Sequence, residues 1–294
     1  MNVNQEKIID EKSVWRIIDK VTALPTVPHV LLHVNKMLQN EDVSVKEMAN
    51  IIESDQVITS RILKLVNSAF YGFRSRIVEI PQAVMILGFN TVRNAVAAVS
   101  LIDLFHMKEK YDGFDIQDLW KHSISVAVTS KCLAQSTRLP IPDDCFVAGL
   151  LHDIGKLVMA EYLQDTFREV LKSTHEDDIS FLEAERRISS VDHAMIGGYL
   201  TQKWQFPQRL VDTIIYHHMV NRNAADFWLH ASVYAANIIV NNSSTLDIVA
   251  DKLAGDCHEL SEVVNRLGAL SEWYAAVDSE IAQVSKFFIE DSGL

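Results

Sequence analysis

Apolar residues recur along most of this chain at spacings of three and four positions, as they do on the buried face of an amphipathic helix. Two such stripes consist of Val30, Leu31, Val34 and Leu38, and of Val57, Ile58, Ile62, Leu65 and Val66. Residues that break regular structure are scarce, since the 294 residues include only 10 glycines and 6 prolines. The pattern predicts an all-α protein, with a brief alternation over residues 74–80 as the one hint of extended chain.

Residues that begin and end helices punctuate this pattern in the first hundred positions. Ser44 followed by Glu47 matches a capping box ahead of an apolar run. Asn90 is placed to cap the long helix that follows it. Gly72 is expected to end the helix that precedes it. Several short helices, packed as one bundle, are therefore expected here.

A polar, charged stretch at 107–118 separates two apolar-periodic regions, as an exposed linker does. In the second region one helix is expected from residue 146 to 162, with breaks near Gly197 and Pro207. We therefore predict two helical lobes. The expected units are an N-terminal helix (1–21), a first lobe (22–108), a linker (109–118) and a second lobe (119–294).

Composition narrows the functional classes. The formal charge is −12, from 39 acidic and 27 basic residues, and such a chain repels a phosphate backbone, so we expect no nucleic-acid partner. No apolar run reaches the roughly 20 residues that span a bilayer, so we expect no membrane partner either. The three cysteines form no CxxC pair, as is usual where thiols stay reduced, which predicts a cytoplasmic location.

The segment GLLHDIGKLVMAEY, residues 149–162, places three ionisable side chains in an apolar helical stretch. On a continuous helix His152 and Asp153 point about 100° apart, so both could reach one ion only over the helix edge. Lys156 is three residues beyond Asp153 and could pair with it or with a bound phosphate. Other histidines of the same region are His122, His175, His193, His217, His218 and His230.

These residues resemble the HD superfamily of metal-dependent phosphohydrolases, whose ligands are a His, a His-Asp pair and a later Asp. His122, His152 and Asp153 match the first three. Dinuclear relatives, such as the HD-GYP phosphodiesterases, add a lysine and further histidines. The matching residues here are Lys156, His193 and one of His217 or His218.

The resemblance narrows to the HDOD family over about residues 22–240. It is carried by LPTVPHVLLHVNKML, DQVITSRILKLVNSAFYG and IVEIPQAVMILGFNTVRNAV, followed by WKHS, AGLLHDIGKLVM, DHAMIGGYLTQKW and HH in the family's order. The resemblance implies a helical signal-transduction or regulatory output module of bacteria, with an HD-like second lobe and without the hydrolytic activity of true HD enzymes. Two departures from the HD pattern agree with that: Asn237 stands nearest to the last metal-binding Asp, and no GYP signature follows the His pair.

Two functions stay open. In the first, the protein is non-catalytic and signals through a protein partner, and its His-Asp set is either a hydrogen-bonded core feature or a metal site without turnover. In the second, it hydrolyses a nucleotide or other phosphoester, with a divalent transition metal such as iron or manganese held by the His-Asp set. Lys156 would then neutralise phosphate charge. His175 and His230 are expected to be surface or core residues, and the oligomeric state stays open.

Overall fold

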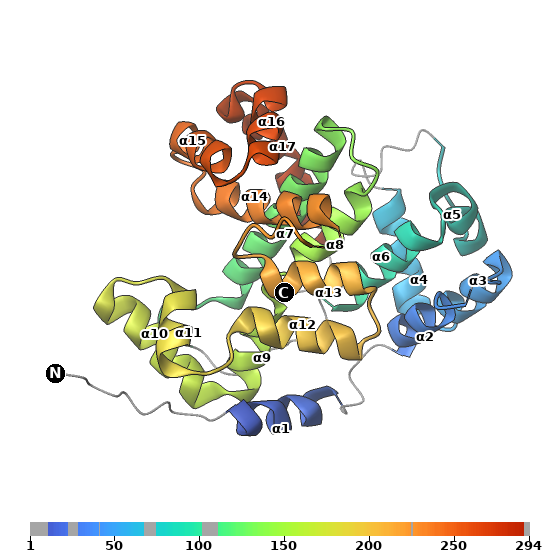
Figure 1. Ribbon diagram of the computed structural model, residues 1–294. Coiled ribbons are helices and arrows are strands. Elements are labelled where there is room, and N and C mark those ends of the chain that lie inside the picture. The colour runs from blue at the N-terminus through green and yellow to red at the C-terminus, as the bar shows by residue number, and fades with distance from the viewer. Residues whose placement is uncertain are drawn as a thin grey trace.

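The computed structural model describes residues 11–22, 29–40, 42–67, 75–101, 111–224 and 226–290, which form helices and no strand (Figure 1). This confirms the all-α prediction. The first helices are α1 (Glu11–Thr22), α2 (His29–Met37), α3 (Val45–Glu53), α4 (Gln56–Val66), α5 (Ile80–Leu87) and α6 (Phe89–Leu101). The described part of 74–80 is irregular chain leading into α5 and not a strand.

The helix boundaries follow from local chemistry in most places. The capping box is present, with Ser44 Oγ accepting from the Glu47 amide and the Glu47 carboxylate accepting from the Ser44 amide. Helix α6 begins at Phe89, so Asn90 lies inside it, and the predicted cap is wrong. The reason is Gly88, which ends α5 at φ +82 and turns the chain directly into α6. Gly72 lies outside the described residues, and α4 already ends at Val66.

The second half contains the longest helix, α7 (Ile116–Ser136), and the elements that follow it. These are α8 (Pro142–Leu151), α9 (Ile154–Tyr162), α10 (Gln164–Asp177), α11 (Phe181–Ile188), α12 (His193–Lys203), α13 (Gln208–Tyr216), α14 (Phe227–Asn241), α15 (Leu246–Asp256), α16 (His258–Leu267), α17 (Leu270–Ser285) and the π-helical turn η2 (Lys286–Glu290). Pro207 separates α12 from α13, as predicted. The predicted break at Gly197 is wrong, because α12 runs through that residue and its missing side chain makes room for Ile154 and Ile214.

Helices α7 and α8 lie at the centre of the fold, where α7 packs against α8, α14 and α17 and α8 packs against α6 (Figure 1). One continuous hydrophobic core includes residues of α2 to α6 and of α7 to α14. A smaller core lies between α14, α15 and α16. Burial of this apolar surface is the main force that holds the helices together.

The N-terminal helix α1 packs against α9 and α12. Val14 and Ile18 are fully buried there, and the Trp15 ring lies 4.8 Å from the ring of Tyr199. The boundaries predicted at 21, 108 and 118 stay predictions. None of the described helices is long and apolar enough to cross a bilayer.

Candidate metal centre

The His-Asp pair lies at a junction between two helices and not within one. His152 is the C-cap of α8 and Asp153 is the N-cap of α9, so the single helix predicted over 146–162 is wrong. Because the axis changes direction between the two residues, their side chains are not held about 100° apart. The Nε2 atom of His152 lies 3.3 Å from Oδ2 of Asp153. The junction thus brings both groups to one point.

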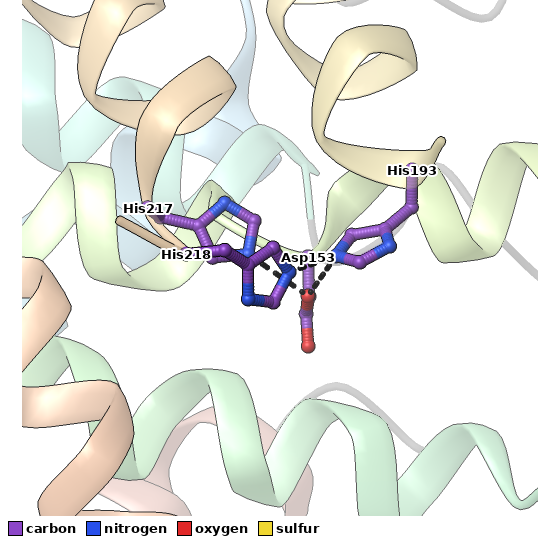
Figure 2. A group of neighbouring side chains, drawn as sticks. All are labelled: Asp153, His193, His217 and His218. Atoms are coloured by element: carbon purple, nitrogen blue, oxygen red, sulfur yellow. Dashed lines mark hydrogen bonds and ion pairs between the residues drawn. The ribbon is translucent and has the colours of Figure 1, made fainter. Parts of the chain in front are cut away.

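Three histidines gather around Oδ1 of Asp153 (Figure 2). The Nε2 atom of His193, the first residue of α12, lies 3.1 Å from this oxygen, and that of His217, the C-cap of α13, lies 3.6 Å from it. The Nε2 atom of His218 lies 2.9 Å from that of His193. Both members of the His pair therefore face the site, and the expectation that only one could do so is wrong. The chain leaves α13 at His217, which frees His218 from the helical spacing.

The other oxygen of the same carboxylate faces a second group. The Nε2 atom of His122, on α7, lies 3.6 Å from Oδ2 of Asp153 and 3.2 Å from Nε2 of His152. The Nζ atom of Lys156 donates to this oxygen at 2.7 Å and lies 5.2 Å from the centre of the Phe181 ring. Asp153 is therefore shared between two sets of nitrogen atoms.

Backbone carbonyls fix the orientation of two of the imidazoles. Nδ1 of His152 lies 2.7 Å from the carbonyl oxygen of Gly149, and Nδ1 of His217 lies 2.7 Å from that of Ile214. A carbonyl only accepts, so in both rings Nδ1 carries the proton. Nε2 then presents a lone pair to the centre, as a metal-binding histidine does.

Glu185 orients His193, and the sequence reasoning missed this residue. It is fully buried on α11, and its carboxylate accepts from the His193 backbone amide at 2.8 Å and from Nδ1 at 2.6 Å. Burial lowers the pKa of His193, but the charge of Glu185 and hydrogen bonds with Asp153 and Glu185 outweigh it and raise that pKa to about 9. The only sequence signal is an acidic residue eight positions before a histidine, which is too common to single out.

The remaining side chains have the protonation states that bind a cation. Burial, with the charge of His152, lowers the pKa of His122 to about 3, and burial lowers that of His217 to about 4. Burial and the neighbouring His217 also lower the pKa of His218. Burial opposes ionisation of Asp153, but His152 and Lys156 hold its pKa well below the usual range. At neutral pH His122, His217 and His218 are thus neutral and Asp153 is ionised, whereas His193 carries a proton that it would release on binding a cation.

Glycines allow the helices of the centre to approach closely. A Cβ atom on Gly155, in the first turn of α9, would lie 1.9 Å from the backbone oxygen of His193. A Cβ atom on Gly198 would lie 2.1 Å from a side-chain carbon of Ile215, on α13. Helices α9, α12 and α13 therefore meet at distances that only glycine permits.

The donor set fits one or two divalent transition metals. Two groups have their ligand atoms within 4.8 Å of one another, namely Asp153 with His193, His217 and His218, and Asp153 with His122 and His152. Two ligands bonded at right angles at about 2.1 Å would lie about 3 Å apart, which is close to the separations found here. Oδ1 of Asp153 and Nε2 of His217 are buried and make no hydrogen bond of good geometry. A cation would satisfy both atoms.

The two ligand groups differ in the number of coordination positions that they would leave free on a metal ion. Four protein ligands are typical of closed, structural sites, whereas three leave a position for water or substrate. On the Oδ2 side, the side chains of His122 and Lys156 are 21% and 19% exposed, while that of Asp153 is 2% exposed. The Oδ2 side of the centre is therefore partly in contact with solvent.

Three other polar residues considered from the sequence lie outside these groups. Asn237, on α14, accepts a hydrogen bond from Asn241 at 2.8 Å and belongs to neither ligand group. His230 is buried, with Nε2 close to the carbonyl oxygen of Met219, and His175 is exposed on α10. Asn237, the residue nearest to the last acidic ligand of the HD pattern in the sequence, thus bonds to its own helix and not to the centre.

Comparison with known proteins agrees with this geometry. The model of the HDOD domain matches residues 24–220. An uncharacterized protein of Treponema pallidum (strain Nichols) is 27% identical over 203 residues, which are 69% of this chain and 39% of that protein. The chain thus matches about two fifths of the length of this curated relative.

Two solved structures share the fold. An HDOD domain protein with unknown function from Geobacter sulfurreducens has a TM-score of 0.69 and 27% identity, covering 95% of this chain and 99% of that one. A protein of Shewanella amazonensis SB2B named "Putative phosphohydrolase" has a TM-score of 0.70 and 25% identity, covering 93% and 98%. With two thirds of its length matched by the family model, this chain belongs to the HDOD domain family.

Proposed function

We propose that this HDOD protein is a regulatory output protein of a bacterial signalling pathway, whose His-Asp centre binds one or two divalent transition-metal ions. It acts by contact with a protein partner and not by turnover. The observation that carries the proposal is the single carboxylate of Asp153, which has imidazole nitrogen atoms close to both of its oxygens. Oδ1 of Asp153 and Nε2 of His217 are buried without a hydrogen bond of good geometry, and a metal ion would satisfy both atoms.

The absence of turnover rests on the acid-base groups at the centre. Asp153 is the only carboxylate in the two ligand groups found among the described residues. Glu185 is buried and bound to His193, and the amide of Asn237 is bound to Asn241. Neither residue is free to activate a water molecule as a general base.

Metal content tests the first part of the proposal. The protein is purified without chelator and compared with Asp153→Asn and with His175→Gln, a control that changes an exposed histidine outside the centre. We expect metal in stoichiometric amount in the wild type and the control, and its loss in Asp153→Asn. Folded wild-type protein that takes up no iron, manganese or zinc on reconstitution would contradict the metal role.

The second candidate is hydrolysis of a phosphoester, which the position of Lys156 favours. Its ammonium group lies on the accessible Oδ2 side, where it could offset the charge of a phosphate. A bound ion would supply a water of pKa about 7 at this position. Metal-loaded wild type and Lys156→Met are assayed on nucleotides, cyclic dinucleotides and an aryl phosphate. Turnover that falls in Lys156→Met at unchanged metal content would favour this function over the first.

A further inference from the structure

Three helices that carry ligands of the centre reach the N-terminal helices with their other ends. Helix α8 ends at His152, α13 ends at His217 and α12 begins at His193. The opposite ends of α8, α12 and α13 contact residues of α2 and α6, as described below. In Figure 1, α12 and α13 run side by side, and the loop that joins them lies on the side of α2 and α6. The centre and this contact therefore lie at opposite ends of the same three helices.

The contact is built around Asp144, in the first turn of α8. Its Oδ1 atom accepts from Arg93 of α6 at 3.2 Å and from the Asn94 amide at 3.0 Å. Its Oδ2 atom lies 2.6 Å from a guanidinium nitrogen of Arg209, in the first turn of α13. Arg93 and Asp144 are buried. One carboxylate thus joins α6, α8 and α13, just as Asp153 joins the same two ligand helices at their far ends.

Two further hydrogen bonds support this contact. The hydroxyl of Thr91, on α6, donates to Asp143 of α8 at 2.7 Å. The amide of Asn35, on α2, donates to the carbonyl oxygen of Trp204, the C-cap of α12, at 2.9 Å, and this bond is buried. Each of the three ligand helices is therefore held by a polar bond at the end away from the centre.

We propose that the occupancy of the His-Asp centre is transmitted to α2 and α6 through α8, α12 and α13, with Asp144 and Arg209 as the positioning residues. This rests on the proposed function, because a metal ion is taken as the occupant. A bound cation would fix the distances between Asp153, His193 and His217, and so the positions of the helices that carry them. The positions of α2 and α6 would then depend on whether the buried centre holds an ion, as regulation of a protein partner requires.

The physical basis is the stiffness of short helices and the sensitivity of buried charge. Asp144 lies eight residues from His152, and Arg209 lies eight from His217, which is about 12 Å along each helix. Over such a length a packed helix moves as a unit. At the far end, Arg93 depends on the carboxylate of Asp144. Burial lowers the pKa of Arg93 to about 10, and the charge of Asp144 opposes this effect. A shift between α8 and α13 therefore changes the environment of Arg93.

The first test uses reciprocity, because sites that are coupled alter each other's affinity equally. The full chain, Arg209→Gln and the control Arg266→Gln are titrated with Mn²⁺ and separately with Zn²⁺ by calorimetry. Arg266 is an exposed residue of α16 whose nearest acidic group is 4.0 Å away. We expect affinity to fall about tenfold in Arg209→Gln, within the range of 5- to 150-fold that is usual for coupled sites, and to be unchanged in Arg266→Gln. Equal affinities in all three proteins would overturn the proposal.

The second test reads the far end directly, and one of its two measurements, a double-mutant cycle, does not depend on a metal. Amide hydrogen exchange in α6 should slow on metal addition in the wild type and respond less in Thr91→Val. In addition, Arg209→Gln and His217→Gln are combined in a double-mutant cycle on unfolding stability. Residues this far apart without shared partners are normally additive, so non-additivity supports the coupling and additivity overturns it. If the wild type binds neither metal, the proposed function fails, and the cycle alone decides this inference.

Discussion

Replacing Gly155 by alanine should separate the two helices that carry Asp153 and His193. The added Cβ atom would lie 1.9 Å from the backbone oxygen of His193 and 2.7 Å from its carbonyl carbon. No side-chain rotation relieves such a contact, because both atoms belong to the backbone. The start of α12 must therefore move away from α9, and the His193 ring must move with it.

The expected cost follows from two opposing effects. Overpacking of a well-packed interior costs about 1–3 kcal/mol, and a contact with immobile backbone belongs at the upper end, at about 3 kcal/mol. Alanine is favoured over glycine inside a helix by about 1 kcal/mol. The net loss of unfolding free energy is then about 2 kcal/mol. Gly255 in α15 provides the matched control, because a Cβ atom there meets nothing within 4 Å, and its replacement should stabilise by about 0.5–1 kcal/mol.

Urea denaturation of the wild type and the two alanine variants, followed by far-ultraviolet circular dichroism, measures these differences. Gly155→Ala should also bind metal more weakly, whereas Gly255→Ala should bind it as the wild type does. The reasoning fails if Gly155→Ala is as stable as the wild type, since the close approach of α9 and α12 would then have no energetic meaning. It also fails if both variants lose stability to the same degree.

Two further predictions concern the buried histidines. In chelator-treated protein, the lowered pKa values of His122 and His217, about 3 and 4, mean that the unfolded chain binds more protons in acid, so stability should fall as pH drops from about 6.5 toward 4. The pKa of His193 is raised to about 9, so the folded chain binds this proton more tightly than the unfolded chain does. Stability should therefore also fall as pH rises from about 6.5 to 9. A flat dependence of stability on pH in urea titrations would contradict both assignments. Glu185→Gln should lower metal affinity about 10- to 100-fold, the usual effect of removing a partner that orients a ligand, whereas the exposed Glu183→Gln should not. Equal affinities in calorimetry would show that His193 needs no such support.

Much of the fold could be predicted because helical periodicity and caps are local properties. The capping box at Ser44 and Glu47 and the break at Pro207 are present where the sequence places them. The errors occur where packing between helices decides. A break was expected near Gly197, but this residue lies within α12, where it makes room for neighbouring side chains. Asn90 is not a cap, because Gly88 turns the chain into α6 two residues earlier.

The candidate site could be predicted from the sequence to a similar degree. The resemblance to the HD superfamily indicated His122, His152, Asp153, His193 and one of His217 or His218 as ligands. The structure brings these residues together and adds the second member of the His pair. Glu185 was out of reach, because its role depends on the contact between α11 and the start of α12 and leaves no pattern in the chain. Orienting partners of this kind are found only once the helices are placed in space.

The break between α8 and α9 is a feature of the site that could not be predicted without the tertiary structure. The residues at the break are a histidine and an aspartate, and not the proline or glycine that commonly interrupts a helix. Yet a continuous helix would point the two side chains about 100° apart, and both could not then face the same imidazoles. Two residues after the pair, at Gly155, α9 packs closely against α12. If that contact imposes the break, then filling the space at Gly155 should weaken the centre even though no ligand is changed.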